Sequence, residues 1–259
     1  NAITLKLFSD PLVSGRIISV LVGFGIALFI SLIAVIIINY QDNEKKLFLF
    51  LKNSLTKHYF LFLFVFLVYC LTPFAFFFDR LALADNLLSL FGVLSLLLTL
   101  LLSKYPNINI SIILGVSLGL AWLTKSPAIY FIVLSFLTFV IFNFKNIKHF
   151  IYPAISSFIA FLIYNILRLG PQFYQIALRN KDYVWTISEV LKHPFDPLKP
   201  HLLNAFDLYI RYISWPIIVL FLIGIVIFIK KNNKLDLKKY LVISAWWLLP
   251  LIANSALSK

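Results

Sequence analysis

Long apolar segments, separated by short polar ones, follow one another along this chain. Several of them approach or exceed the roughly 18 residues that a membrane-spanning helix needs. The pattern predicts an all-α, polytopic membrane helix bundle with about eight transmembrane helices. Their expected ranges are Ile17–Asn39, Tyr59–Phe78, Asn86–Ser103, Ile108–Thr124, Ala128–Asn143, Phe150–Leu167, Leu208–Ile229 and Tyr240–Asn254.

The fourth and fifth segments are short, and Lys125, Ser126 and Pro127 separate them. As one helix they would be about 54 Å long at ~1.5 Å per residue, well beyond a hydrocarbon core of roughly 30 Å. Pro127 also disfavours helix at the residue before it. We therefore predict two spans with a reversal of the chain between them.

Composition supports a membrane protein. Hydrophobic residues make up 61% of the 259 positions, and the mean hydropathy is +0.95. The net charge of +13 does not indicate a nucleic-acid partner, because the basic residues lie in short loops between apolar segments. Cys70 is the only cysteine, so the chain has no intrachain disulfide, and its place in an apolar segment indicates packing.

Lysines set the expected orientation. With eight spans, four loops on one side carry twelve of them, and this side is predicted to be cytoplasmic. These are Lys45, Lys46, Lys52, Lys57, Lys104, Lys145, Lys148, Lys230, Lys231, Lys234, Lys238 and Lys239. The segment 79–85 and the outer loop 170–206 then face outward. We expect one transmembrane domain over residues 1–259, in the cell membrane, with its active face outside the cytoplasm.

The outer loop 170–206 is rich in aromatic, histidine, proline and charged residues. Thr186 and Glu189 have the spacing of a capping box and predict a short helix from Thr186 to Lys192. Tyr183 and Trp185 are candidates for stacking on a sugar, although anchoring at the membrane interface fits them equally. His193 and His201 are eight residues apart, which favours surface histidines over metal ligands.

A polar break between the second and third apolar segments holds Asp79, Arg80 and Asp85. Ionisable groups at a membrane boundary indicate a functional site. Arginine and lysine there suit a phosphate whose tail lies in lipid, and carboxylates beside them can bind a divalent metal or act as a general base. The expected ligand is amphipathic, with a polyprenyl tail and a phosphorylated head.

Four stretches in register resemble one family. The stretch from Pro73 to Asp85 resembles the second outer loop of the GT-C membrane glycosyltransferases, in the branch of the protein O-mannosyltransferases and the aminoarabinose and rhizobial lipopolysaccharide sugar transferases. The other three are similar to the family's arginine-containing entry to its second helix, its glycine-rich helix ending in Thr-Lys, and the start of a later lysine-bearing outer loop. They are Ser14–Ser19, Gly115–Lys125 and Ser255–Lys259.

The resemblance implies transfer of a sugar, with inversion, from a polyprenyl-phosphate donor to an acceptor hydroxyl of a protein or glycan on the outer face. It places Asp85 as the catalytic candidate. The donor phosphate would bind Arg16, Arg80, Lys125 and Lys259. Independently of the resemblance, their place in the outer loop makes Tyr183, Trp185, His193 and His201 candidates to meet the sugar or acceptor. The family's proposed base lies in a loop that would precede Asn1. We therefore expect a fragment that is inactive alone, and the metal requirement stays open.

Other interpretations remain for the same residues. Asp85 can simply cap the next helix, and Arg16 and Lys125 can be snorkelling anchors. Gly115 and Gly119, with Ser111, predict close helix packing. As a whole, the chain can also be a secondary transporter, with Lys125-Ser126-Pro127 as a broken helix, or a non-catalytic scaffold that binds polyprenyl phosphate.

Overall fold

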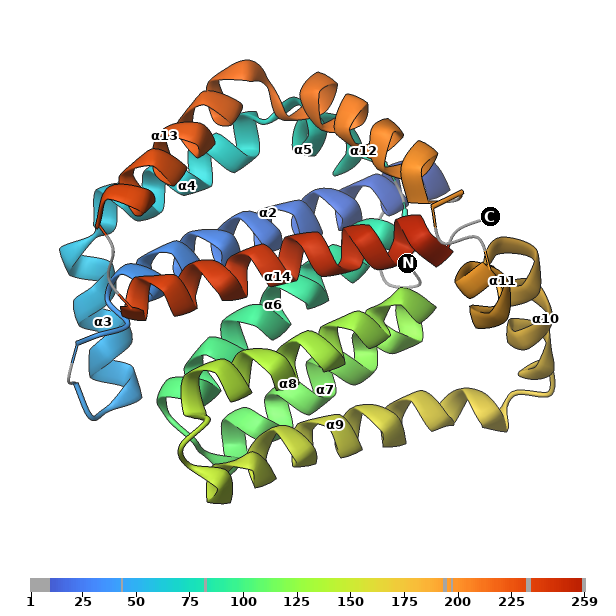
Figure 1. The fold of residues 1–259 in the computed structure, drawn as a ribbon, viewed down its shortest axis with the longest axis horizontal. Coiled ribbons are helices and arrows are strands. Elements are labelled where there is room, and N and C mark those ends of the chain that lie inside the picture. Colours follow the sequence, from blue (N-terminus) through green and yellow to red (C-terminus); the bar gives the residue numbers. More distant parts are fainter. Residues whose placement is uncertain are drawn as a thin grey trace. The chain divides into compact units, whose positions relative to one another are not determined.

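The computed structural model describes residues 10–42, 44–81, 83–192, 195–196, 198–231 and 234–257. Within these ranges the chain is helical, without a strand, and it forms two compact units, residues 1–160 and 161–259 (Figure 1). The all-α prediction is confirmed for the described residues.

The first unit contains seven α-helices and most of an eighth among its described residues. They are α2 (Pro11–Ile38), α3 (Leu47–Lys57), α4 (Tyr59–Leu71), α5 (Pro73–Phe78), α6 (Ala84–Lys104), α7 (Ile108–Thr124), α8 (Ile129–Asn143) and α9 (Ile151–Tyr164), with short 3-10 turns at Ser126–Ala128 and Ile147–Phe150. The second contains the 3-10 turn Asn165–Leu169 and then α10 (Tyr174–Tyr183), α11 (Ile187–Lys192), α12 (Leu198–Ile213), α13 (Trp215–Lys231) and α14 (Lys234–Leu257).

Five described helical segments are long and apolar enough to cross a membrane, and up to seven if each of two bent helix pairs is one span. The five are Leu12–Ile38, Ala84–Lys104, Ser126–Asn143, Ile147–Leu169 and Leu237–Leu257. Helix α7 is apolar but has 17 residues. Every apolar segment of the sequence is thus helical, and the figure of eight spans stays a prediction.

Helices α2 and α4 run in opposite directions. At one end, a ring nitrogen of His58 lies 3.1 Å from the side-chain oxygen of Asn39. Farther along, Phe66 of α4 stacks on Phe24 of α2, with ring centroids 6.2 Å apart. Higher residue numbers in α4 contact lower residue numbers in α2, so the two helices are antiparallel, as in a membrane hairpin.

Helix α6 is parallel to α2. A Cβ atom added at Gly25 of α2 would lie 2.8 Å from the Leu90 side chain, so the two helices approach closely there. Lys104 is the last residue of α6, and its ammonium donates to the backbone oxygens of Tyr40 and Asp42, just beyond α2, at 2.7 and 2.8 Å. Lys104 therefore fastens the end of α6 to the turn after α2.

Helix α7 returns antiparallel to α6. The hydroxyl oxygens of Ser95 and Ser117 lie 3.2 Å apart in the middle of the pair. The ammonium of Lys125, just beyond the end of α7, lies 2.5 Å from a carboxylate oxygen of Asp85 in the first turn of α6.

Helix α8 then runs parallel to α6. A Cβ atom at Gly92 would meet the Phe131 ring at 2.6 Å, and the amide of Asn143 donates to the backbone oxygen of Ser103 at 3.0 Å. Both α7 and α8 therefore lie along α6, and the chain reverses between them (Figure 1). The predicted reversal at Lys125-Ser126-Pro127 is confirmed.

Small residues on α7 allow close packing against α9, as predicted. Ser111, Gly115 and Gly119 are all buried. The Ser111 hydroxyl lies 3.0 Å from that of Ser156, and a Cβ atom at Gly115 would come within 2.8 Å of the Ser156 backbone oxygen and of Ile159. Such proximity is possible only without a side chain at position 115.

Two expected helices are broken in the structure. The segment 59–78 is interrupted at Thr72, where extended backbone precedes Pro73, and α4 is also bent by 78° from α3. The segment 208–229 is interrupted at Ser214, which has a φ of 74°, and α12 meets α13 at 109°. Pro73 and Pro216 both lie in the first turn of the following helix, where proline is tolerated.

The second unit corrects the prediction for the loop 170–206. Most of this stretch is helical: α10 was not predicted, and α12 begins inside the loop and continues to Ile213. The predicted helix at 187–192 is present, and its capping box is formed by hydrogen bonds between Thr186 and Glu189. Farther along, Trp247 of α14 donates to the Tyr209 hydroxyl of α12 at 3.1 Å.

Candidate functional site

Because the helices of the first unit run in alternating directions, different residues lie at its two ends. The "Asp85 end" comprises the start of α2, residues 79–81 and 83–85, and Lys125. The "Lys104 end" comprises residues 39–42 and 44–46, Lys104 and the end of α8. In this unit, the described residues of the segment 79–85 and Lys125 therefore share one end, opposite Lys104, as the lysine distribution predicts.

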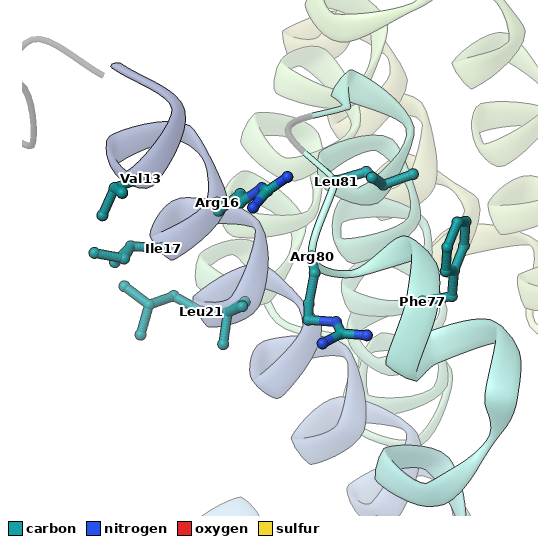
Figure 2. A pocket seen from close by; sticks show the side chains of 8 residues that line it. Val13, Arg16, Ile17, Leu21, Phe77, Arg80 and Leu81 are labelled. Carbon is teal, nitrogen blue, oxygen red and sulfur yellow. The ribbon is translucent and has the colours of Figure 1, made fainter. Parts of the chain in front are cut away.

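A groove of about 510 Å³ opens at the Asp85 end, between the first turns of α2 and the segment that follows α5 (Figure 2). Two cations, Arg16 from α2 and Arg80 from the opposite wall, line it. The rest of the lining is apolar: Val13, Ile17, Val20, Leu21, Phe77 and Leu81. The volume lies within the ~300–1,000 Å³ typical of sites for small molecules.

The two arginines differ in how they are held. Arg80 donates from Nε to the Phe76 backbone oxygen at 2.8 Å, and its guanidinium lies 4.2 Å above the centroid of the Phe76 ring. Arg16 has no hydrogen bond or ion pair with another residue of the described ranges. Neither arginine is matched by a carboxylate within the groove lining, so together they suit an anion.

Asp85 and Lys125 form the second feature of this end. Both are partly exposed, with side-chain exposures of 58% and 41%. Leu83 occupies the N-cap position of α6, and Asp85 lies inside the first turn, so Asp85 is not the cap. In this position, the negative charge of Asp85 is stabilised by the positive N-terminal end of the helix dipole. Only one carboxylate oxygen of Asp85 has a described partner, Lys125.

The structure therefore brings the predicted residues together as two pairs. Arg16 shares the groove with Arg80, and Asp85 pairs with Lys125. Arg80 and Asp85 are five residues apart, so their Cα atoms lie within about 18 Å at ~3.3–3.6 Å per residue. Convergence of Arg16, Asp85 and Lys125 on one cavity stays a prediction.

Asp79 belongs to the same end; the sequence placed it in the polar break but did not single it out as a site residue. It follows α5 directly, accepts a hydrogen bond from the Tyr69 hydroxyl at 3.1 Å, and lies against Gly23 of α2. Burial raises the pKa of the Asp79 carboxyl above its ordinary value, and the hydrogen bond from Tyr69 opposes that rise. Tyr69 and Gly23 lie within apolar helices, so no pattern in the sequence indicated them.

The remaining candidates lie in the second unit or outside the described residues. Tyr183 ends α10 with 65% of its surface exposed, and the backbone amide of Trp185 donates to the Leu257 oxygen at 2.8 Å. His201 lies in α12 and is half-buried. His193 and Lys259 lie outside the described residues. The roles predicted for all five stay predictions.

A metal site was left open by the sequence. Among the described residues, no group of three or more His, Cys, Asp or Glu side chains is arranged to hold a metal ion. At the Asp85 end, the two arginines of the groove suit binding of an anion, and the carboxylate of Asp85 suits binding of hydroxyl groups.

Comparison with protein-family models, with curated proteins and with solved structures found no match to this chain. The GT-C resemblance therefore stands on the four sequence stretches, and any function rests on the residues at the Asp85 end.

Proposed function

We propose that this chain belongs to a membrane glycosyltransferase that moves a sugar from a polyprenyl-phosphate donor to an acceptor hydroxyl, on the outer face of the membrane. One observation carries the proposal: two arginines, neither of which has a carboxylate partner among the described residues, line an apolar groove at the Asp85 end. A lipid phosphate needs both features at once, cations for its head and apolar walls for its tail.

The groove has an apolar wall for the tail and two arginines for the phosphate. Val13, Ile17 and Leu21 follow one another at intervals of four along α2, so they share a face of that helix (Figure 2). A prenyl tail lies along such a face, continuing into the surrounding lipid. The phosphate then meets Arg16 and Arg80, whose guanidinium groups offer paired N–H donors.

In the transfer reaction, an acceptor hydroxyl attacks the anomeric carbon and its proton passes to a carboxylate, while the bond from carbon to the phosphate oxygen breaks. The leaving phosphate keeps the electron pair, and the arginines stabilise its charge. Asp85 retains one carboxylate oxygen for the acceptor, because Lys125 engages the other. Lys125 thus holds the Asp85 carboxylate in place, with its other oxygen available to the acceptor hydroxyl.

Secondary transport is the weaker proposal. The interruption at 125–127 joins two antiparallel helices at one end of the unit, whereas transporters place a broken helix near the midplane. A scaffold that only binds the lipid phosphate would use the same groove, and it differs from the transferase in having no need of Asp85.

Binding of the phosphate is tested with the chain in phosphatidylcholine nanodiscs and farnesyl phosphate as the probe. We expect Arg16→Gln and Arg80→Gln each to weaken binding about tenfold or more, because a charged hydrogen bond is worth roughly 1.5–3 kcal/mol. Arg211→Gln, which alters an exposed arginine paired with Asp207, is the matched control. Equal affinity in all four proteins would contradict the proposal.

A further inference from the structure

A second, smaller cavity adjoins the arginine groove. It has a volume of about 230 Å³ and shares Val20 and Arg80 with the groove, so the two spaces meet at Arg80. Aromatic side chains from three helices line it, and one carboxylate, that of Asp79, faces it. Apart from Val20 and Arg80, its lining residues have no part in the proposed donor-phosphate site.

The walls of the small cavity combine ring faces with hydrogen-bonding groups. Phe24, Tyr69 and Phe76 supply the rings. Asp79 supplies acceptor oxygens, and its Oδ2 atom already accepts from the Tyr69 hydroxyl at 3.1 Å. Aromatic rings beside a carboxylate and a guanidinium are suited to a ligand with apolar C–H faces and several hydroxyl groups.

Gly23 makes room for the carboxylate. A Cβ atom at position 23 would lie 2.5 Å from Oδ2 and 2.8 Å from Cγ of Asp79, closer than non-bonded atoms approach. The Asp79 side chain therefore occupies the space that any other residue at position 23 would fill. α2 and the segment after α5 are thus packed so that a carboxylate is held between them.

We propose that the Asp79 cavity binds the glycosyl head of the donor while Arg16 and Arg80 bind its phosphate. This inference rests on the proposed function and adds the site for the sugar. Asp79 accepts hydrogen bonds from sugar hydroxyls, and Phe24 or Phe76 lies against the C–H face of the ring. Arg80, which borders both spaces, marks the point where phosphate and sugar are joined.

The test compares farnesyl phosphate with farnesyl phosphate carrying glucose, mannose or arabinose, on the chain in phosphatidylcholine nanodiscs. We expect at least one sugar to raise the affinity of the wild-type chain. Asp79→Asn should lower the affinity for the sugar-bearing probe about tenfold, and it should leave the affinity for bare farnesyl phosphate unchanged. Gly23→Ala should do the same, because its methyl group displaces the carboxylate.

Asp207→Asn is the matched control, since it neutralises a carboxylate outside the cavity and should alter no affinity. The outcomes separate the two proposals. Absence of binding to bare farnesyl phosphate overturns the proposed function. Binding of that probe with no gain from any sugar, or a gain that survives Asp79→Asn, overturns the sugar site alone. An equal loss for both probes in Asp79→Asn would show a structural role and also overturn it.

Discussion

At the scale of single residues, the Asp85 end contains charges that folding alone does not require. Asp85 and Lys125 are forty positions apart in sequence and meet at an exposed ion pair. Exposed pairs of this kind typically contribute only ~0–1 kcal/mol to stability. Arg16 lines an apolar groove without a described partner. The proposed function accounts for these placements.

The Lys125→Gln variant separates the two explanations. We expect the thermal midpoints of Lys125→Gln and of the control Arg211→Gln in detergent both to change little, because both ion pairs are exposed. Sugar transfer by the protein at its native length should fall strongly in Lys125→Gln only, since Asp85 loses the group that orients it. A large loss of stability without loss of transfer would assign the pair to folding.

Asp79 gives a prediction about pH. Its folded-state pKa is raised by burial, whereas in the unfolded chain it stays near the ordinary ~3.9. Between these two values the folded protein binds the proton and the unfolded chain does not, so stability falls as pH rises through that window. In thermal unfolding, the midpoint should decline more steeply in the wild-type protein than in Asp79→Asn. Parallel profiles would refute this.

At the scale of elements, the sequence predicted the helices but not all of their breaks. Apolar segments must be helical in lipid, because only a helix satisfies its backbone groups internally. The interruptions at Thr72 and Ser214 were missed, although Pro73 and Pro216 were visible signals of them. The contact of Asp79 with Tyr69 depends on the angle between α4 and α5 at the Thr72 break, and no linear pattern encodes that angle.

Gly115 offers a test of helix packing. In Gly115→Ala the added methyl group would lie 2.8 Å from the backbone oxygen of Ser156, which cannot move aside like a side chain. We expect a loss of about 1–3 kcal/mol, the usual cost of overpacking. Gly224→Ala in α13 is the matched control, since nothing lies within 4 Å of its Cβ position. A similar thermal midpoint in both variants would contradict the described packing of α7 on α9.

At the scale of the whole molecule, the described helices of the first unit alternate in direction and separate two chemically different ends. At the Lys104 end, the ammonium of Lys104 donates to backbone oxygens of the turn after α2 and lies over an aromatic ring. The Asp85 end combines acidic and basic groups with an apolar groove. This polarity is what an outward-facing site with a cytoplasmic lysine face requires.

Labelling with a membrane-impermeant maleimide tests that orientation. In a Cys70→Ser background, Ser126→Cys should react in intact cells, because position 126 is exposed at the Asp85 end. Asn146→Cys, which is exposed beyond the end of α8, should react only after the membrane is permeabilised. The reverse pattern would place the Asp85 end in the cytoplasm and contradict the proposed active face.

Transfer of radiolabelled sugar from a polyprenyl-phosphate donor, in membranes that contain the protein at its native length, tests the central claim most directly. Asp85→Asn preserves size and removes the charge at the start of α6. The account predicts that wild-type membranes transfer sugar and that Asp85→Asn lowers the rate by roughly 10²–10⁴-fold, with the protein still inserted. Absence of transfer by the wild-type protein from any polyprenyl-phosphate sugar, or an unchanged rate in Asp85→Asn, would contradict it.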